Sequence, residues 1–436
     1  MTVFKELKKL NYKGKKEKET LTERKKYQSE FASLFSEVAF DQISKGDDLF
    51  NWYNKSDNVR GCGGRVFVDS EDKIEAAFFC KDSLCPMCNW RRSAKLQSQN
   101  IKIMSELFKN NKGLKQEYIF ITWTVRNAKT SEELRSSYAD MSTAFNRMNG
   151  RKVFKENSLG FIKAVETTVN SQRGSEWFGS YNQHMHDLRA FKKGFLSNFG
   201  KSKEEQEETL SAYFSDVWKE SARLDYTPMV KVEVVKTKNM QSLMNAVLEV
   251  SKYSVKGDDI LNSKFSRKEK LKIVLDLERA MKGHRKISYG GIFASIRKEL
   301  GLTDVEKMDL ADELEDKKEN DVIRQIDWSY SIKRYEVVSR LSRAEFNSMR
   351  DGYASSRPGG WQDYLSSNRQ RIPGEKFDKK EAWQEARSIW LMADEEKVEK
   401  LKYHQNEADK GLRQSAKVLA YFYNEFCKFS NKNAIG

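Results

Sequence analysis

The sequence predicts an α+β fold in which helices flank an antiparallel β-sheet. Three observations support this prediction. In the middle of the 436-residue chain, segments rich in β-branched and aromatic residues alternate with segments of helical periodicity. Before them, four of the five cysteines fall within 27 residues, which indicates a small cysteine-rich module. After them, amphipathic patterns indicate a mainly helical C-terminal region.

The composition divides the chain into five expected regions. The boundaries depend on a Lys-rich N-terminal segment, the cysteine cluster, the strand-like segments and a polar stretch with nine acidic residues. They predict a basic helical arm at 1–50, a cysteine-rich module and helix at 51–110, the sheet domain at 111–302, an acidic linker at 303–321 and a helical region at 322–436.

The positive charge is concentrated in the first two-thirds of the chain. Lys and Arg total 79 and Asp and Glu total 64, for a net charge of +15. Residues 1–300 carry a net charge of +16, and residues 301–436 carry −1. Such a field favours a polyanion partner, most simply nucleic acid. A generally lysine-rich composition is the alternative explanation of the total.

No membrane segment is expected. No uncharged apolar run approaches the roughly 18 residues that a membrane span needs. Lys5, Glu6, Lys8 and Lys9 interrupt any signal-peptide core at the N-terminus. We therefore expect a cytoplasmic protein without a membrane partner.

Cys62, Cys80, Cys85 and Cys88 form the cysteine cluster. Cys85-Pro-Met-Cys88 is a CxxC turn that directs two thiolates at one ion, and four tetrahedral thiolates suit Zn²⁺. We expect a closed structural Zn²⁺ site that stabilises a module and performs no chemistry. The spacing is irregular for a zinc ribbon, so binding by three thiolates and four metal-free buried cysteines remain alternatives.

Basic residues directly follow the cluster. Arg91, Arg92 and Lys95 lie where a small zinc module often contacts phosphates, and Arg126 follows a predicted strand. We expect these four residues to contact DNA. For the first three, the alternative is the solvated start of the next helix.

The elements of the sheet domain follow one another along the chain. Strand signals, with frequent β-branched and aromatic residues, lie at 118–125, 161–169 and 229–235. The apolar residues between them recur at helical spacing. Helices are therefore predicted at 131–148, 203–224 and 242–255.

Two of the four histidines lie close together, in Asn182-Gln-His-Met-His186. Residues i and i+2 of a strand face the same side, so His184 and His186 are expected to point into one site. Two imidazoles and an oxygen ligand leave open positions on Mg²⁺ or Mn²⁺ for a substrate phosphate. The alternative is a pair of surface histidines on an edge strand.

The predicted helix at 242–255 has a distinctive face. Glu249, Tyr253 and Lys256 lie at i, i+4 and i+7, so they share one side. This pattern fits an ordinary solvated face, and it also fits a nucleophile with its helpers. A phenol has a pKa of about 10 and attacks poorly unless the phosphate is polarised.

Several segments together point to one known family. They are Phe120–Asn127, Gly160–Asn170, Tyr181–His186, Glu249–Lys256 and Ser288–Phe293, preceded by the cysteine-rich text of residues 85–92. In order and rough spacing, this set resembles the rolling-circle replication initiators of small plasmids of Gram-positive bacteria, the Rep type 1 group of the HUH endonuclease superfamily. The resemblance spans about residues 60–300.

The resemblance implies a fold and a metal site. Residues 111–302 would form an HUH nicking and joining domain. His184 and His186 would be its metal-binding pair, and Glu166 would be the third ligand. The Asp187-Leu-Arg-Ala text after His186 departs from the family, whose strand continues apolar. Asp187 is expected either to orient a metal ligand or to be solvated.

The resemblance also implies a reaction and partners. Tyr253 would attack origin DNA, hold a 5′-phosphotyrosine link and later rejoin the strand, while Glu249 would activate water at termination and Lys256 would steady the phenolate or the phosphate. The partners would be double- and single-stranded origin DNA, a host helicase and polymerase, and further copies of the chain. A relaxase or single-strand transposase, and a non-catalytic zinc-stabilised nucleic-acid-binding protein, are the alternatives.

Overall fold

The structure is a computed structural model. It describes residues 21–41, 49–109, 115–236, 240–252, 255, 257–305, 321–367, 379–409, 415, 418–419 and 422. The described parts of Asn89–Asp309 form one compact unit, here unit 1. Those of Lys18–Cys88 and Leu310–Gly436 form a second compact unit, unit 2.

Unit 1 contains a five-stranded sheet. Its strands are β3 (Gln116–Thr124), β4 (Ser158–Val169), β5 (Tyr181–Lys192), β6 (Val230–Val235) and β7 (Ile287–Gly290). They lie in the order β6-β3-β5-β4-β7, and every neighbouring pair is antiparallel. Strands β3, β4 and β6 occupy the three segments that the sequence predicted as strands. Strand β5, which contains both histidines of the Asn182–His186 segment, lies at the centre of the sheet.

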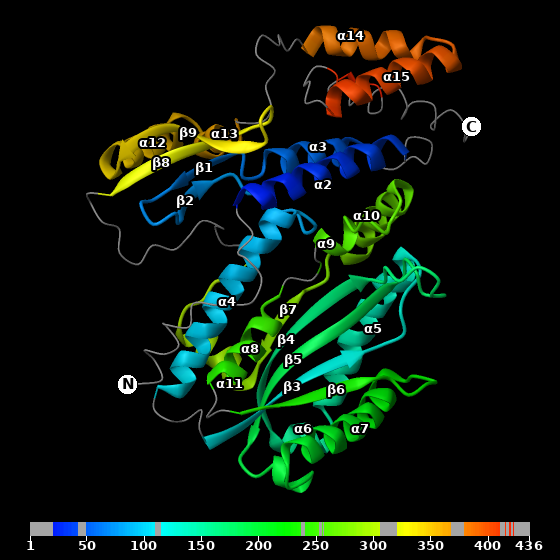
Figure 1. The fold of residues 1–436 in the computed structure, drawn as a ribbon, viewed down its shortest axis with the longest axis vertical. Coiled ribbons are helices and arrows are strands. Elements are labelled where there is room, and N and C mark those ends of the chain that lie inside the picture. The colour runs from blue at the N-terminus through cyan, green and yellow to red at the C-terminus, as the bar shows by residue number, and fades with distance from the viewer. Residues whose placement is uncertain are drawn as a thin grey trace. The chain divides into compact units, whose positions relative to one another are not determined.

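Helices cover both faces of this sheet (Figure 1). One face packs against α5 (Ser131–Asn149), α6 (Lys152–Asn157) and α7 (Lys203–Ala222). The other face packs against α4 (Pro86–Phe108), α8 (Met240–Val250) and α11 (Gly291–Glu299). Shorter or peripheral elements are η3 (Leu196–Asn198), α9 (Gly257–Ile260) and α10 (Arg267–Met281).

Strand alternation explains why there are two separate cores. Trp123 and Met185 face α5, α6 and α7, whereas Phe120 and Leu188 face α4, α8 and α11. Helices α5 and α7 also begin at hydroxyl caps, because the side chains of Thr130 and Ser202 accept hydrogen bonds from backbone amides of the first turn. The predicted helices at 131–148 and 203–224 are thus confirmed.

The predicted helix at 242–255 is too long. Helix α8 ends at Val250, and Ser251, Lys252 and Val255 are not helical. The buried Ser251 hydroxyl donates to the carbonyl of Val247, and the amide of Ser251 donates to Leu248, so the last turn tightens. The face that the sequence predicts for Glu249, Tyr253 and Lys256 stays a prediction, because Tyr253 and Lys256 lie outside the described residues.

Glycines allow strand β7 and helix α11 to approach strand β4 closely. A Cβ atom at Gly291 would lie 2.1 Å from the carbonyl oxygen of Leu159, and the φ angle of Gly291 is +56°. A Cβ atom at Gly290 would lie 2.3 Å from the ring of Phe161. Only glycine fits these positions, which explains the Gly-Gly pair in the Ser288–Phe293 segment.

Unit 2 contains a smaller antiparallel sheet and several helices. The strands are β1 (Arg65–Val68), β2 (Ile74–Ala77), β8 (Val322–Ser329) and β9 (Arg334–Ser342), in the order β2-β1-β8-β9. Helices α12 and α13 pack on one face of this sheet around Phe67, Ile323 and Phe346. The helices are α2 (Leu21–Asp41), α3 (Leu49–Gly61), α12 (Arg343–Ser356), α13 (Gly360–Ser366), α14 (Lys379–Trp390) and α15 (Asp394–Asp409).

This division differs from the expected regions in two ways. Residues 322–342 form two strands, and β8 pairs with β1 of the cysteine-rich module, so the C-terminal region is not an independent helical region. Helix α2 is part of unit 2, with Phe31 and Phe35 fully buried, and is not a separate arm. Pairing between residues more than 250 positions apart leaves no local signal in the sequence.

Some expectations fall on residues outside the described part. These are the Lys-rich N-terminal segment up to residue 20, most of the acidic linker at 303–321, and residues Tyr253 and Lys256. Among the described residues, no helix has both the length and the apolar character that a membrane span requires.

Candidate functional site

The pairing of three adjacent strands brings the candidate metal ligands together. In the β4–β5 pair, Glu166 lies directly opposite His184. In the β3–β5 pair, Thr122 lies directly opposite His186. Because His184 and His186 are two positions apart, all four side chains lie on the sheet face that packs against α8.

The Glu166 carboxylate lies between the two imidazoles. Its Oε2 atom is 3.1 Å from Nε2 of His186 and 3.8 Å from Nε2 of His184. The two imidazole centroids are 4.8 Å apart. Glu166 and His186 are buried and His184 is half-buried, and one ligand atom from each residue lies within 4.8 Å of the others. Two nitrogens and one oxygen converge on a volume the size of one ion.

The other ring nitrogen of each histidine has a partner of its own. Nδ1 of His184 lies 3.2 Å from the carbonyl oxygen of Asn182, which can only accept a hydrogen bond. Nδ1 of His186 lies 3.3 Å from the hydroxyl of Thr122. With the proton at Nδ1, the neutral ring of His184 presents its Nε2 lone pair to the space beside Glu166. Nε2 of His186 donates a hydrogen bond to the Glu166 carboxylate, so its Nδ1 accepts one from the Thr122 hydroxyl. Phe120 stacks on the ring of His186 at 5.3 Å.

Helix α8 brings a second carboxylate to this site. Oε1 of Glu249 lies 4.0 Å from Nε2 of His186, and about a third of the Glu249 side chain is exposed. Glu249 also forms an ion pair with Lys252. The described chain reaches Lys252, one residue before Tyr253.

A buried network fixes the turn after α8. The side-chain amide of Asn100, on α4, donates to the hydroxyl of Ser251 at 2.9 Å. The phenol of Tyr289, on β7, donates to the Asn100 carbonyl oxygen, also at 2.9 Å. Burial raises the pKa of Tyr289, so this phenol stays protonated as a donor. We did not predict this network, because only the tertiary fold brings residues 100, 251 and 289 together.

The opposite face of strand β5 carries a buried ion pair. Asp187 and Arg189 are both fully buried, with 2.8 Å between the guanidinium and the carboxylate. Burial raises the pKa of Asp187 while Arg189 lowers it, and the indole of Trp123 donates to the same carboxylate. Both expectations for Asp187 are therefore wrong. The side chain of Asp187 is neither solvated nor on the face of the candidate ligands His184 and His186, because adjacent strand residues point to opposite faces.

The residues expected to contact DNA differ in exposure. The side chains of Arg91, Arg92 and Lys95 are buried, which contradicts the alternative expectation of a solvated helix start. The guanidinium of Arg92 donates to Asn89. Arg126 follows β3 and remains 57% exposed, 4.4 Å from the ring of Tyr226. Of these four residues, Arg126 is the exposed one, and the DNA contacts expected of all four stay a prediction.

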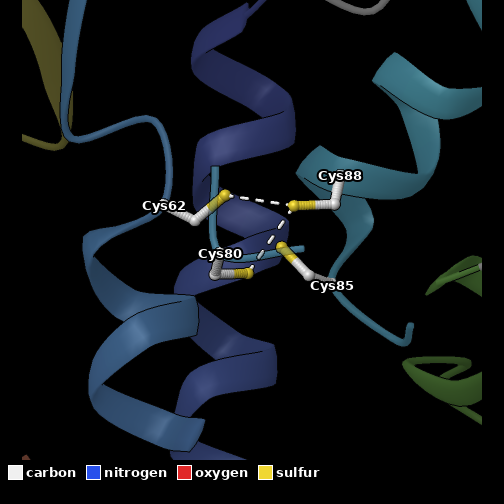
Figure 2. Close-up of side chains that lie close together, drawn as sticks. All are labelled: Cys62, Cys80, Cys85 and Cys88. Atoms are coloured by element: carbon white, nitrogen blue, oxygen red, sulfur yellow. Dashed lines mark hydrogen bonds between the residues drawn. The ribbon is translucent and has the colours of Figure 1, made fainter. Parts of the chain in front are cut away.

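The four cysteines of the cluster converge in unit 2 (Figure 2). One sulfur from each lies within 4.8 Å of the other three. Cys62 follows α3, Cys80 follows β2, and Cys85 and Cys88 lie at the start of α4. Their four segments thus meet at one point, and all four thiols are free of disulfide bonds.

Comparisons with known proteins identify the class. Residues 71–336 match the family model described as a replication protein (Rep_1). The chain is 35% identical over 264 residues to "Protein rep" of Lactiplantibacillus plantarum, which covers 59% of this chain and 78% of that protein. It is 33% identical over 292 residues to "Protein rep" of Lentilactobacillus hilgardii, covering 65% and 88%.

A further relative supports the same assignment. "Protein rep" of Streptococcus pneumoniae serotype 2 is 34% identical over 258 residues, which cover 58% of this chain and 74% of that protein. No solved structure shows significant similarity to the chain. The matched segment contains β3, β4, β5 and α8, and therefore the whole histidine site. The chain belongs to the Rep type 1 family of plasmid replication initiators.

Proposed function

We propose that the chain initiates rolling-circle replication by nicking plasmid origin DNA, with Tyr253 as the nucleophile. Membership of the replication protein family supports a role in plasmid replication. The observation that carries the chemistry is the convergence of His184, His186 and Glu166 beside the end of α8. Tyr253 itself lies outside the described residues and directly follows Lys252, the last residue of the described stretch that contains α8.

The donor set fits a divalent cation such as Mg²⁺ or Mn²⁺. Two imidazole nitrogens and one carboxylate oxygen would hold the ion and leave coordination positions for a phosphate. The contacts of Nδ1 with the Asn182 carbonyl and the Thr122 hydroxyl hold both rings so that their Nε2 atoms point at the site. When bound, the ion supplies charge neutralisation at the scissile phosphate.

The side chains of this protein would then perform the transfer. The phenol of Tyr253 releases its proton to solvent, its oxygen attacks the phosphorus, and the bond from phosphorus to the 3′ oxygen breaks. That oxygen takes up a proton and leaves as the 3′-OH that primes synthesis, while the 5′-phosphate stays on Tyr253. Attack by a 3′-OH reverses the step and rejoins the strand. The number of phosphoester bonds is unchanged in each direction.

Glu249 and Lys256 have supporting roles in this proposal. Glu249 lies 4.0 Å from His186 and is partly exposed, so its carboxylate can take a proton from a water molecule that enters the site. Hydrolysis or a second transfer at termination then needs no second tyrosine. Lys256 would provide positive charge to the phenolate or the phosphate.

We infer that unit 1 is an HUH endonuclease-like domain. The support is its five-stranded antiparallel sheet with the two histidines on the central strand. Relaxases and single-strand transposases share this chemistry, and family membership favours an initiator over them. The charge of +16 in residues 1–300 favours origin DNA as a partner, and strand opening and synthesis would require a host helicase and polymerase.

Cleavage of single-stranded oligonucleotides tiled across the replicon that encodes the chain tests this proposal. We expect wild-type protein to cleave one oligonucleotide with Mn²⁺ and to lose cleavage with a chelator. Tyr253→Phe and the double variant His184→Ala, His186→Ala should bind that oligonucleotide without cutting it. Tyr213→Phe and His284→Ala are matched controls that should cut normally. A non-catalytic DNA-binding protein would cut none of the set, and cleavage by Tyr253→Phe would exclude this nucleophile.

A further inference from the structure

The sulfurs of the cysteine cluster lie close enough together to bind one ion, since one sulfur of each cysteine is within 4.8 Å of the other three. Sγ of Cys88 lies 3.5 Å from Sγ of Cys62 and 3.6 Å from Sγ of Cys80. Four sulfurs at about 2.3 Å from a central Zn²⁺ would be about 3.8 Å from one another along each edge. A disulfide bond would require about 2.05 Å. The measured separations are therefore close to a tetrathiolate cage and far from a disulfide.

The backbone around the cluster is shaped to bring the sulfurs together (Figure 2). Lys81, directly after Cys80, has a φ angle of +57°, which is rare for a residue with a side chain. The carboxylate of Asp82 accepts a hydrogen bond from the amide of Leu84 and turns the chain back toward Cys85. The short loop from Cys80 to Cys85 thus returns to the first turn of α4.

A buried lysine lies beside the cluster. Lys25, on α2, is fully buried, and its ammonium donates hydrogen bonds of 2.7 Å to the carbonyl oxygens of Arg60 and Cys62. A buried ammonium is costly unless negative charge compensates it, and carbonyl groups supply only dipoles.

We propose that Cys62, Cys80, Cys85 and Cys88 bind one Zn²⁺ as a tetrathiolate, and that Lys25 is the buried cation that balances this site. When the ion binds, four thiols release four protons, and the resulting group carries a net charge of −2. The Lys25 ammonium reduces this excess to −1 in an interior where unbalanced charge is unfavourable. All four coordination positions are filled, so the site stabilises structure and performs no chemistry.

This site is independent of the proposed nicking reaction. It joins the end of α3, the loop after β2 and the start of α4. The order of unit 2 near the cluster would therefore depend on the ion. The zinc proposal would be contradicted if two of the thiols formed a disulfide bond, or if the four thiols bound no metal.

Metal analysis of the full chain, purified under reducing conditions without chelator, tests the ion. We expect one equivalent of zinc, released in proportion as a mercurial reagent titrates the thiols. The variants Cys62→Ser and Cys85→Ser should each lose most of the bound zinc. Cys427→Ser is the matched control, because it removes the fifth cysteine, which lies outside the described residues. This variant should keep all of its zinc. Absence of zinc, or equal retention by all variants, would overturn the proposal.

Cobalt substitution of the wild-type chain keeps the test valid even if the serine variants fail to fold. A tetrathiolate site predicts the intense visible bands of tetrahedral Co²⁺ together with sulfur-to-metal charge transfer in the near ultraviolet. Weak bands of octahedral Co²⁺ without charge transfer would contradict the assigned ligands. Added Zn²⁺ should abolish the tetrahedral bands.

Lys25 is tested by the rate at which zinc passes to a chromophoric chelator. We expect Lys25→Met to release zinc about 10- to 100-fold faster than wild type, the range for loss of a supporting partner of a metal site. Lys26→Met is the matched control, because Lys26 is the next residue on α2 and is exposed. Lys25→Arg should restore slow release. An unchanged rate in Lys25→Met would exclude the charge-balancing role.

Discussion

Replacing Asp187 with alanine should destabilise the strand that carries the histidines. Asp187 and Arg189 are both fully buried and are 2.8 Å apart, so the change leaves a buried guanidinium without its counter-charge. Breaking a buried pair from one side costs about 3–5 kcal/mol. Arg189 keeps hydrogen bonds to Asn149 and Ser158, so we expect a loss near the lower end, about 3 kcal/mol.

Hydrogen–deuterium exchange of peptides from β3 and β5 measures this loss within unit 1 alone. A loss of about 3 kcal/mol corresponds to exchange faster by roughly 100-fold, since about 1.4 kcal/mol is tenfold. Glu220→Ala breaks the solvent-exposed Arg151–Glu220 pair and is the control, with an expected loss below about 1 kcal/mol.

A double variant separates the charge from the packing. Asp187→Leu with Arg189→Met removes both charges and keeps apolar volume, so it should be less destabilised than Asp187→Ala. A stabilising role of the ion pair is refuted if Asp187→Ala accelerates exchange by less than about tenfold, or if the double variant exchanges faster than the single one. Either result would mean that the pair does not stabilise β5.

Three further predictions concern the metal site, termination and pH. Thr122→Val should weaken Mn²⁺ binding, measured by calorimetry, about 10- to 100-fold, because Nδ1 of His186 loses its hydrogen-bond partner. Thr143→Val, on an exposed face of α5, is the control and should leave Mn²⁺ binding unchanged. Glu249→Gln should leave the first nick intact and slow release of the finished strand, and equal loss of both steps would assign Glu249 to substrate positioning instead. Burial raises the pKa of Tyr138 and Tyr181 above the ordinary value of about 10, so the folded state keeps protons that the unfolded state loses. Their contribution to stability is complete below pH 10 and falls as the pH rises above it. Tyrosinate absorbance with circular dichroism should show late ionisation that coincides with unfolding, and ionisation of all 17 tyrosines before unfolding would contradict this.

Local patterns were sufficient for three strands of the central sheet. The β-branched and aromatic residues of β3, the strand character of β4 and the alternation of β6 predicted them, and the spacing of His184 and His186 predicted that both rings share a face, whereas β7 was not predicted. The opposition of Glu166 and His184 requires the register of β4 against β5, which no local pattern encodes. Thr122 was likewise missed, although it lies within the quoted Phe120–Asn127 segment.

The misjudged features are those that depend on tertiary packing. A charged residue such as Arg92 reads as solvated from its sequence neighbours, yet its side chain is buried. Asp187 reads as a surface or ligand-orienting residue until its partner Arg189 is seen on the same buried face. Strands β8 and β9 were missed because β8 pairs with β1, far away in the sequence. Lys25 has no sequence signal that links it to the cysteines.

The most direct test of the nicking proposal is mass spectrometry of peptides from the reaction with the cleaved oligonucleotide. We predict a nucleotide joined through its 5′-phosphate to Tyr253. The adduct should be absent from Tyr253→Phe and from the double histidine variant, and present in Tyr213→Phe. An adduct on another residue, or cleavage that leaves no covalent intermediate, would contradict the proposed mechanism.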